Sequence, residues 1–192
     1  DDLLVFAGEH GLKVGTIRDL IHYRRHHDRI LERASERTIE TRGYGTWKSI
    51  EFRSRIDGSR HLALVKGRID PTTPTLVRMH VPDILADVCG AEGPFEDGVL
   101  AASMKIIADA GKGIIGLIPA SYDFALGLVQ ANSSPANETL CDYGRGAQIL
   151  VDLGARDIEL LTNSYPEPVA LSAYGLRIIG ERSLVGHKPA AR

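Results

Sequence analysis

Apolar and polar residues alternate through the first half of the chain, and this pattern predicts a block of antiparallel strands. Between residues 37 and 81 the hydrophobic pattern has a period of two, which is typical of half-buried strands. The strand-like segments are 37–45, 46–56, 60–69 and 75–81. Asp57-Gly58 lies between the second and third segments and is a hairpin-turn signal.

In the second half, apolar positions at helical spacing alternate with short apolar runs. Helices are predicted over 96–110, 121–131, 137–155 and 166–175, and strands over 113–118, 157–163 and 176–185. Helices are also predicted before the β block, over 3–10 and 16–34, the latter with Thr16 as N-cap. The order predicts a mixed α/β (α+β) fold, with an N-terminal antiparallel β block and an alternating α/β C-terminal half.

The change of period near residues 33–37 marks the predicted linker. It divides the chain into a helical lead-in, residues 1–36, and a larger domain, residues 37–192. A chain of 192 residues is long enough for one sizeable domain with an appended piece.

Charge and cysteine content exclude several classes of protein. The net charge of −2 argues against nucleic-acid or membrane-surface partners, which usually require a clear basic excess. No apolar run approaches the roughly 18 residues of a membrane span. Cys89 and Cys141 are too few for a disulfide scaffold or a four-thiolate zinc site, so a reducing cytoplasm is expected.

The stretch RMHVPDILADVCGAEGPFEDG, residues 78–98, is rich in groups that could bind a metal. Its ligand-type side chains are His80, Asp83, Asp87, Cys89, Glu92, Glu96 and Asp97. Their spacing matches no recognised metal site, and catalytic zinc requires three fixed ligands with an open position. Two interpretations stay open, a metal site and a solvated acidic loop, and the composition favours the loop.

Other candidate residues have ordinary explanations. Cys141 lacks a visible base and is favoured as a structural cysteine. The GKG at 111–113 lacks the frame of a phosphate-binding loop, so a helix C-cap turn is preferred. Thr162 follows a predicted strand, where it could contact a ligand or cap a turn.

Longer segments resemble a known family. GAQILVDLGARDIELLTN and YGLRIIGERSL are similar to GTP cyclohydrolase II, which opens GTP at the start of riboflavin synthesis. The family is also similar to the segment LALVKGRIDPTTPTLVRMH, which contains the family's Arg-x-His motif at Arg78 and His80. The resemblance covers roughly residues 37–185.

The lead-in FAGEHGLKVGTIRDLIHYRRHHDR resembles a different domain. It is similar to the end of 3,4-dihydroxy-2-butanone 4-phosphate synthase and its join to the cyclohydrolase in two-domain proteins. The resemblance therefore implies a synthase domain normally fused upstream, and a homodimer.

The chain departs from the family at the positions that carry chemistry. The family binds catalytic zinc through Cys-x10-Cys-x-Cys, and the corresponding positions here are Asp83, Pro94 and Glu96. Proline removes one ligand and two carboxylates do not reproduce soft thiolates, so no zinc cofactor is expected. The family's zinc activates the attacking water, so that step would lose its nucleophile.

Further family positions are also altered. The Gln-Glu-Gly-Arg segment has no counterpart, and Asp-x-Arg-Asp-Tyr appears with Thr139 and Cys141 in place of its acid–base aspartate and its arginine. A lysine of the family becomes Glu167, which would repel a triphosphate. No catalytic residue is assigned, and Arg78, His80 and Thr162 are the ligand positions that carry over.

The leading hypothesis is a catalytically inactive GTP cyclohydrolase II-like domain that supports, dimerises or regulates a synthase domain. The first alternative is a binding module that senses GTP, another nucleotide or a flavin. A third is an enzyme with altered activity built on His80, Asp83 and Glu96, for which magnesium or manganese would be the expected metal.

Overall fold

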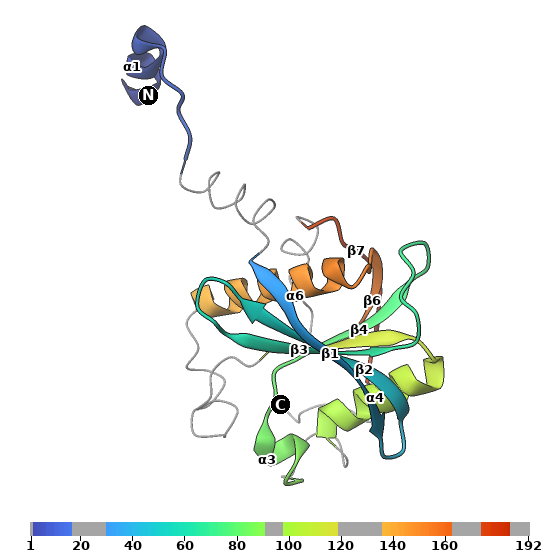
Figure 1. Ribbon diagram of the computed structural model, residues 1–192. Coiled ribbons are helices and arrows are strands. Elements are labelled where there is room, and N and C mark those ends of the chain that lie inside the picture. Colours follow the sequence, from blue (N-terminus) through green and yellow to red (C-terminus); the bar gives the residue numbers. More distant parts are fainter. Residues whose placement is uncertain (1, 17–29, 91–97, 119–135, 163–173, 185–192) are drawn as a thin grey trace, which may run out of the picture.

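The computed structural model describes residues 2–16, 30–90, 98–118, 136–162 and 174–184 (Figure 1). Its strands are β1 Leu31–Thr41, β2 Gly45–Ser54, β3 Arg60–Lys66, β4 Thr75–His80, β5 Gly113–Leu117, β6 Asp157–Leu161 and β7 Arg177–Arg182. Its helices are α1 Asp2–His10, α3 Ile84–Asp87, α4 Gly98–Ala110 and α6 Ala136–Asp152. The mixed α/β class predicted from the sequence is confirmed.

The strands form one seven-stranded mixed sheet, in the order β1-β2-β3-β5-β4-β6-β7. The first three strands pair antiparallel, and β3 pairs antiparallel with β5. The pairs β4–β5, β4–β6 and β6–β7 are parallel. The predicted antiparallel block and the alternating C-terminal half are therefore parts of a single sheet.

The predicted hairpin between β2 and β3 is confirmed. Asp57 accepts a hydrogen bond from the Ser59 amide at 3.1 Å, and Gly58 has a φ of +70° that glycine adopts readily. The GKG turn is confirmed as well, because the Gly111 amide donates to the Ala108 carbonyl directly after α4.

The predicted helix over residues 16–34 is wrong at its end, because residues 31–34 belong to β1. Long-range pairing overrides local helix propensity here: Glu32 binds Arg55 at 2.8 Å and Glu36 binds Lys48 at 3.0 Å across the β1–β2 pair. The predicted linker at 33–37 therefore falls inside a strand. The wider division into 1–36 and 37–192 stays a prediction.

Several other predicted elements can be compared with the structure. Helices at 3–10, 96–110 and 137–155 correspond to α1, α4 and α6, with small differences at their ends. The predicted helix over 121–131, most of the one over 166–175 and residues 17–29 lie outside the described residues. No helix in the described part of the chain has the length and apolarity needed to cross a bilayer.

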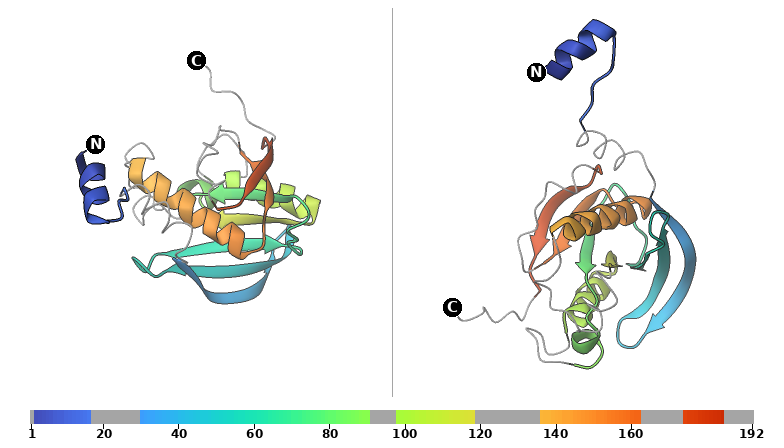
Figure 2. Two further views of the ribbon diagram at one scale, coloured as in Figure 1. Left: turned by 90° about the horizontal axis from the view of Figure 1, so that it is seen from above. Right: turned by 90° about the vertical axis from the view of Figure 1, so that its left-hand side faces the viewer.

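Helices α6 and α4 cover opposite faces of the sheet (Figure 2). A hydrophobic cluster on the α6 face includes Phe52, Val77, Ile149, Leu150 and Ile158. A second cluster on the α4 face includes Trp47, Leu76, Ile107, Ile115 and Leu161. Each of the strands β1 to β6 contributes to both clusters, so the register of a strand decides which of its side chains face α4.

Candidate functional site

A buried histidine–aspartate pair closes the end of β4. The Nε2 atom of His80 lies 2.7 Å from Oδ2 of Asp87, and each side chain is 7% exposed. The same carboxylate oxygen accepts the backbone amide of Asp83 at 3.0 Å. The solvated-loop interpretation is therefore wrong for Asp87, because a side chain seven residues along returns to His80 and is buried with it.

The Asp83 side chain also forms hydrogen bonds to the backbone of the short helix that follows it. It is the N-cap of α3, and its Oδ1 atom accepts the amides of Leu85 at 3.0 Å and Ala86 at 3.2 Å. The sequence predicts that this carboxylate occupies the first of the family's zinc-ligand positions. Pro94 and Glu96, at the other two positions, lie outside the described residues. Within the described ranges, no three His, Cys, Asp or Glu side chains form a group suited to a metal.

Arg78 lies two residues before His80 in β4, on the same face of the strand. Its Nη1 donates to the Leu161 carbonyl at 3.0 Å, while its buried Nε has no hydrogen-bond partner among the described residues. Burial lowers the pKa of this guanidinium, and the charge of Asp87 opposes that shift.

Thr162 follows directly after Leu161, so the structure brings two of the carried-over positions, Arg78 and Thr162, to neighbouring strand ends. The backbone amide of Thr162 donates to the Arg182 carbonyl at 3.1 Å. The parallel strands β4 and β6 both end at this edge, which is where open α/β sheets usually bind ligands.

Two rows of directly paired residues extend this site across the sheet. Ser35 pairs with Glu51, Glu51 with Leu62, Leu62 with Leu117, and Leu117 with His80. The neighbouring row runs through Arg37, Ser49, Leu64, Ile115 and Arg78. Because paired residues project from the same face, the side chains of both rows lie on the side of the sheet that α4 covers.

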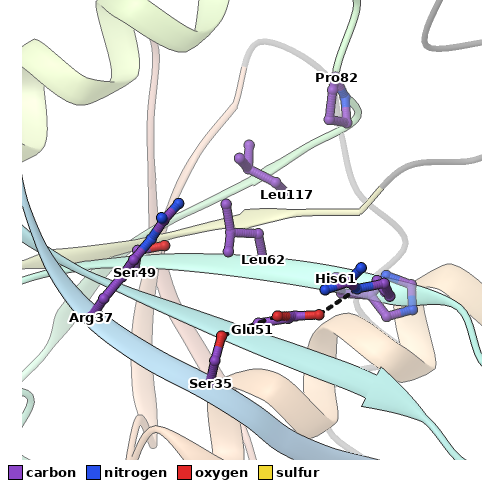
Figure 3. Close-up of a pocket in the computed structure, with 9 residues that line it drawn as sticks. Ser35, Arg37, Ser49, Glu51, His61, Leu62, Pro82 and Leu117 are labelled. Carbon is purple, nitrogen blue, oxygen red and sulfur yellow. Dashed lines mark hydrogen bonds and ion pairs between the residues drawn. The ribbon is translucent and has the colours of Figure 1, made fainter.

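A cavity of about 560 Å³ opens over these rows on the antiparallel strands (Figure 3). Its polar lining includes Ser35, Arg37, Ser49, Glu51 and Arg60. Sequence reasoning missed these five residues, because each resembles an ordinary polar position in an alternating strand. Only the pairing register shows that they share a face.

Glu51 is the fixed acceptor in this cavity. It forms an ion pair with Arg60 and accepts the Ser35 hydroxyl at 3.0 Å. The hydrogen bond from Arg60 and then the one from Ser35 lower the pKa of this carboxyl. Glu51 is therefore ionised at neutral pH and balances the charge of Arg60.

His61 also lines the cavity, although it pairs with Phe52 of the cluster on the α6 face. It is 2% exposed, and its Nε2 lies 3.1 Å from the Ser59 hydroxyl. Burial, followed by the charge of Arg145, lowers the pKa of His61 to about 4, and Asp57 opposes this shift. His61 is thus a neutral histidine at physiological pH.

A sequence profile of the GTP cyclohydrolase II family matches residues 32–183. The chain belongs to the GTP cyclohydrolase II family. Riboflavin biosynthesis protein RibBA of Mycobacterium tuberculosis is 39% identical over 200 residues, covering 93% of this chain and 47% of that protein. The RibBA protein of Mycobacterium marinum is 38% identical over the same span.

A solved structure is similar as well. It is the crystal structure of RibBX, described as a two-domain 3,4-dihydroxy-2-butanone 4-phosphate synthase from A. baumannii. The TM-score is 0.54 at 32% identity, and the match covers 95% of this chain and 48% of that one. The chain thus spans about half the length of the relatives it matches.

Proposed function

We propose that this chain is a GTP cyclohydrolase II-like domain that has lost zinc binding and GTP ring opening. In this role it supports, dimerises or regulates a 3,4-dihydroxy-2-butanone 4-phosphate synthase domain. The observation that carries the proposal is the hydrogen-bonded unit of His80, Asp83 and Asp87. This unit uses protein atoms to fix the segment in which the family places its first zinc thiolate.

The side chains at the zinc positions do not fit a three-thiolate site. Asp83 offers a hard carboxylate whose Oδ1 already accepts two amides, and Pro94 has no ligand atom. Without zinc, no group is assigned to generate the attacking hydroxide. Thr139 and Cys141 likewise supply neither the carboxylate base nor the guanidinium of the family motif.

The relatives support the partner role. RibBA proteins are about twice the length of this chain, and RibBX is described as a two-domain synthase although one of its parts resembles this domain. A domain of this fold attached to a synthase is consistent with a non-catalytic role, either in assembly or in regulation. The homodimer belongs to the same proposal.

Metal analysis combined with a GTP turnover assay tests the loss of activity. The purified chain is incubated with excess zinc, desalted and measured by plasma mass spectrometry, and GTP conversion is followed by chromatography. A zinc-loaded, active GTP cyclohydrolase II serves as the positive control. We expect substoichiometric zinc and no pyrimidine product; stoichiometric zinc with product formation would overturn the proposal.

The partner role needs a separate measurement. The chain is fused to a 3,4-dihydroxy-2-butanone 4-phosphate synthase domain, and synthase activity, thermal stability and mass are compared with those of the synthase domain alone. A change in at least one of these properties is expected. Identical activity, stability and mass would contradict a supporting, regulatory or dimerising role.

Arg78 favours the second candidate function, sensing of a nucleotide or flavin. Its buried Nε lacks a partner within the described residues, and such a donor has a desolvation cost that a ligand acceptor would offset. A thermal-shift panel of GTP, GMP, FMN and riboflavin tests this, because a ligand at 100 times its Kd stabilises by about 2.7 kcal/mol. An Arg78→Met variant should lose any shift given by GTP or riboflavin, and no shift with these two ligands in the parent chain would remove this candidate.

A further inference from the structure

The cavity on the antiparallel strands has a lining that family membership does not assign to any role. Ser35 and Arg37 come from β1, Ser49 and Glu51 from β2, and Arg60 from β3. The two residues carried over from the family, Arg78 and His80, lie in β4 on the same face. The cavity therefore continues that face across the antiparallel strands, and Pro82, two residues after His80, also lines it.

Arg37 supplies a positive charge that forms no ion pair in the described part of the chain, although this charge helps, after the hydrogen bond from Arg60, to lower the pKa of the nearby Glu51 carboxyl. Three other arginines of the block are paired, Arg33 with Asp152, Arg55 with Glu32 and Arg60 with Glu51, and all three differ from Arg37 in this respect. In the described part of the chain, Arg37 has neither an ion pair nor a hydrogen bond from its side chain. With Arg60 and Glu51 cancelling each other, the lining has a net charge of about +1 from Arg37.

Ser49, the direct strand partner of Arg37, adds a hydroxyl group. The residue is 3% exposed and lines the cavity, yet its hydroxyl makes no hydrogen bond to a described residue. Among the described residues, the fully buried side-chain atoms without a hydrogen-bond partner belong to His61, Thr75 and Arg78, so the Ser49 hydroxyl is accessible from the cavity and can donate to a ligand there. A guanidinium and a hydroxyl on adjacent strands are together suited to a tetrahedral oxyanion, which arginine can bind through two parallel hydrogen bonds.

The remaining lining suits the body of a polar ligand. Glu51 is held by Ser35 and Arg60, so its carboxylate is positioned to accept hydrogen bonds from hydroxyl groups. Leu62 and Leu117 form an apolar floor beside it (Figure 3). The volume of about 560 Å³ lies within the range typical of small-molecule sites.

We propose that this cavity binds a phosphate monoester that carries hydroxyl groups. Arg37 and Ser49 hold the phosphate, and Glu51 accepts hydrogen bonds from the hydroxyls of the ligand. The proposal goes beyond loss of cyclohydrolase activity, because it assigns a ligand class to five residues outside the inherited positions. It does not depend on whether zinc or GTP turnover is absent.

Isothermal titration at constant ionic strength tests the ligand class, with ribose 5-phosphate as the probe. Ribose lacks the phosphate, inorganic phosphate lacks the hydroxyls, and succinate offers carboxylates instead. We expect ribose 5-phosphate to bind at least tenfold more tightly than each of the other three. Equal affinity for succinate would overturn the phosphate assignment, and no binding of ribose 5-phosphate would overturn the site.

Variants locate the site. Arg37→Gln should weaken ribose 5-phosphate binding at least tenfold, and Ser49→Ala several-fold. Lys48→Gln is the matched control, because Lys48 precedes Ser49 in β2, projects from the opposite face and pairs with Glu36 at 3.0 Å. It should change the affinity less than twofold, and an equal loss in Lys48→Gln would show non-specific charge attraction instead.

Two further measurements show why a variant loses affinity for ribose 5-phosphate. Urea unfolding of each variant separates loss of binding from loss of folding, and Ser49→Ala decides the question if Arg37→Gln is unstable. Arg78→Met should leave ribose 5-phosphate affinity within twofold of the parent chain. A loss in Arg78→Met equal to that in Arg37→Gln would place the ligand at the inherited position and overturn the proposal.

Discussion

The imidazole of His80 and the carboxylate of Asp87 form a 2.7 Å hydrogen bond that ties the end of β4 to the end of α3. Both side chains are 7% exposed, and Asp87 also accepts the Asp83 amide. The Asp87 carboxylate is therefore the hydrogen-bond partner of both the buried His80 side chain and the Asp83 backbone amide. The segment that follows Arg78 and His80 is fixed by this unit through hydrogen bonds between protein atoms.

Replacing Asp87 with alanine should destabilise the chain by about 1–3 kcal/mol, because it leaves His80 and the Asp83 amide without their acceptor. The free energy of unfolding in urea measures this effect. Asp109→Ala in α4 is the control: that residue is exposed, and its substitution should change stability by less than about 0.5 kcal/mol. Equal effects of the two substitutions would contradict a structural role for the pair.

His61 should make the stability of the chain depend on pH. Its pKa is about 4 in the folded chain and 6.5 as the ordinary value, so the unfolded state binds more protons between these pH values. The stability it contributes is fully present above pH 6.5 and is lost as the pH falls toward 4. The shift corresponds to at most about 3 kcal/mol.

Urea unfolding of the parent chain and His61→Gln at several pH values between 4.5 and 7.5 measures this contribution. Glutamine cannot titrate, so the variant should show a shallower decline of stability with acidification. The difference between the two unfolding free energies should narrow as the pH falls. Parallel curves for the two proteins would refute the assignment of this pH dependence to His61.

Gly113 lies where β5 passes close to β4 and α4. A Cβ at this position would meet the Leu76 carbonyl oxygen at 2.8 Å and Cγ2 of Ile107 at 2.7 Å. Since that carbonyl belongs to a paired strand, Gly113→Ala should cost about 2 kcal/mol or more of unfolding free energy. In Gly180→Ala the nearest atom would be the Glu159 Cγ at 3.7 Å, so this control should be nearly neutral. If Gly113→Ala lowered the free energy of unfolding no more than Gly180→Ala does, the strand would tolerate the added methyl group at position 113.

Much of this fold could be predicted from local patterns. The Asp57-Gly58 turn and the period-two segments identify the antiparallel block, and helical spacing identifies α4 and α6. The start of β1 could not be predicted in the same way. Its first residues, LERA, favour a helix by composition, and only pairing with β2 places them in the sheet.

The candidate site was harder to predict from the sequence than the fold was. The family resemblance identified Arg78, His80 and Thr162, but not the partner of His80, because Asp87 lies seven positions along in an acidic stretch without a recognised spacing. The residues of the cavity were missed for a different reason. Arg37 and Ser49 are twelve positions apart and become neighbours only through the β1–β2 register.

Arg145 links α6 to the β2–β3 hairpin, and it should influence the titration of His61. Its Nη2 donates to Asp57 at 2.5 Å, and its positive charge is the second cause of the lowered His61 pKa. Arg145→Gln removes that charge while Asp57 continues to favour the protonated imidazole. The pKa of His61 in the folded chain should therefore rise toward 6.5, which can be followed by NMR titration of its ring protons. Arg33→Gln, which removes a charge paired with Asp152, is the control and should leave the titration unchanged. A His61 titration that is the same in Arg145→Gln and in the parent chain would mean that burial alone sets its pKa.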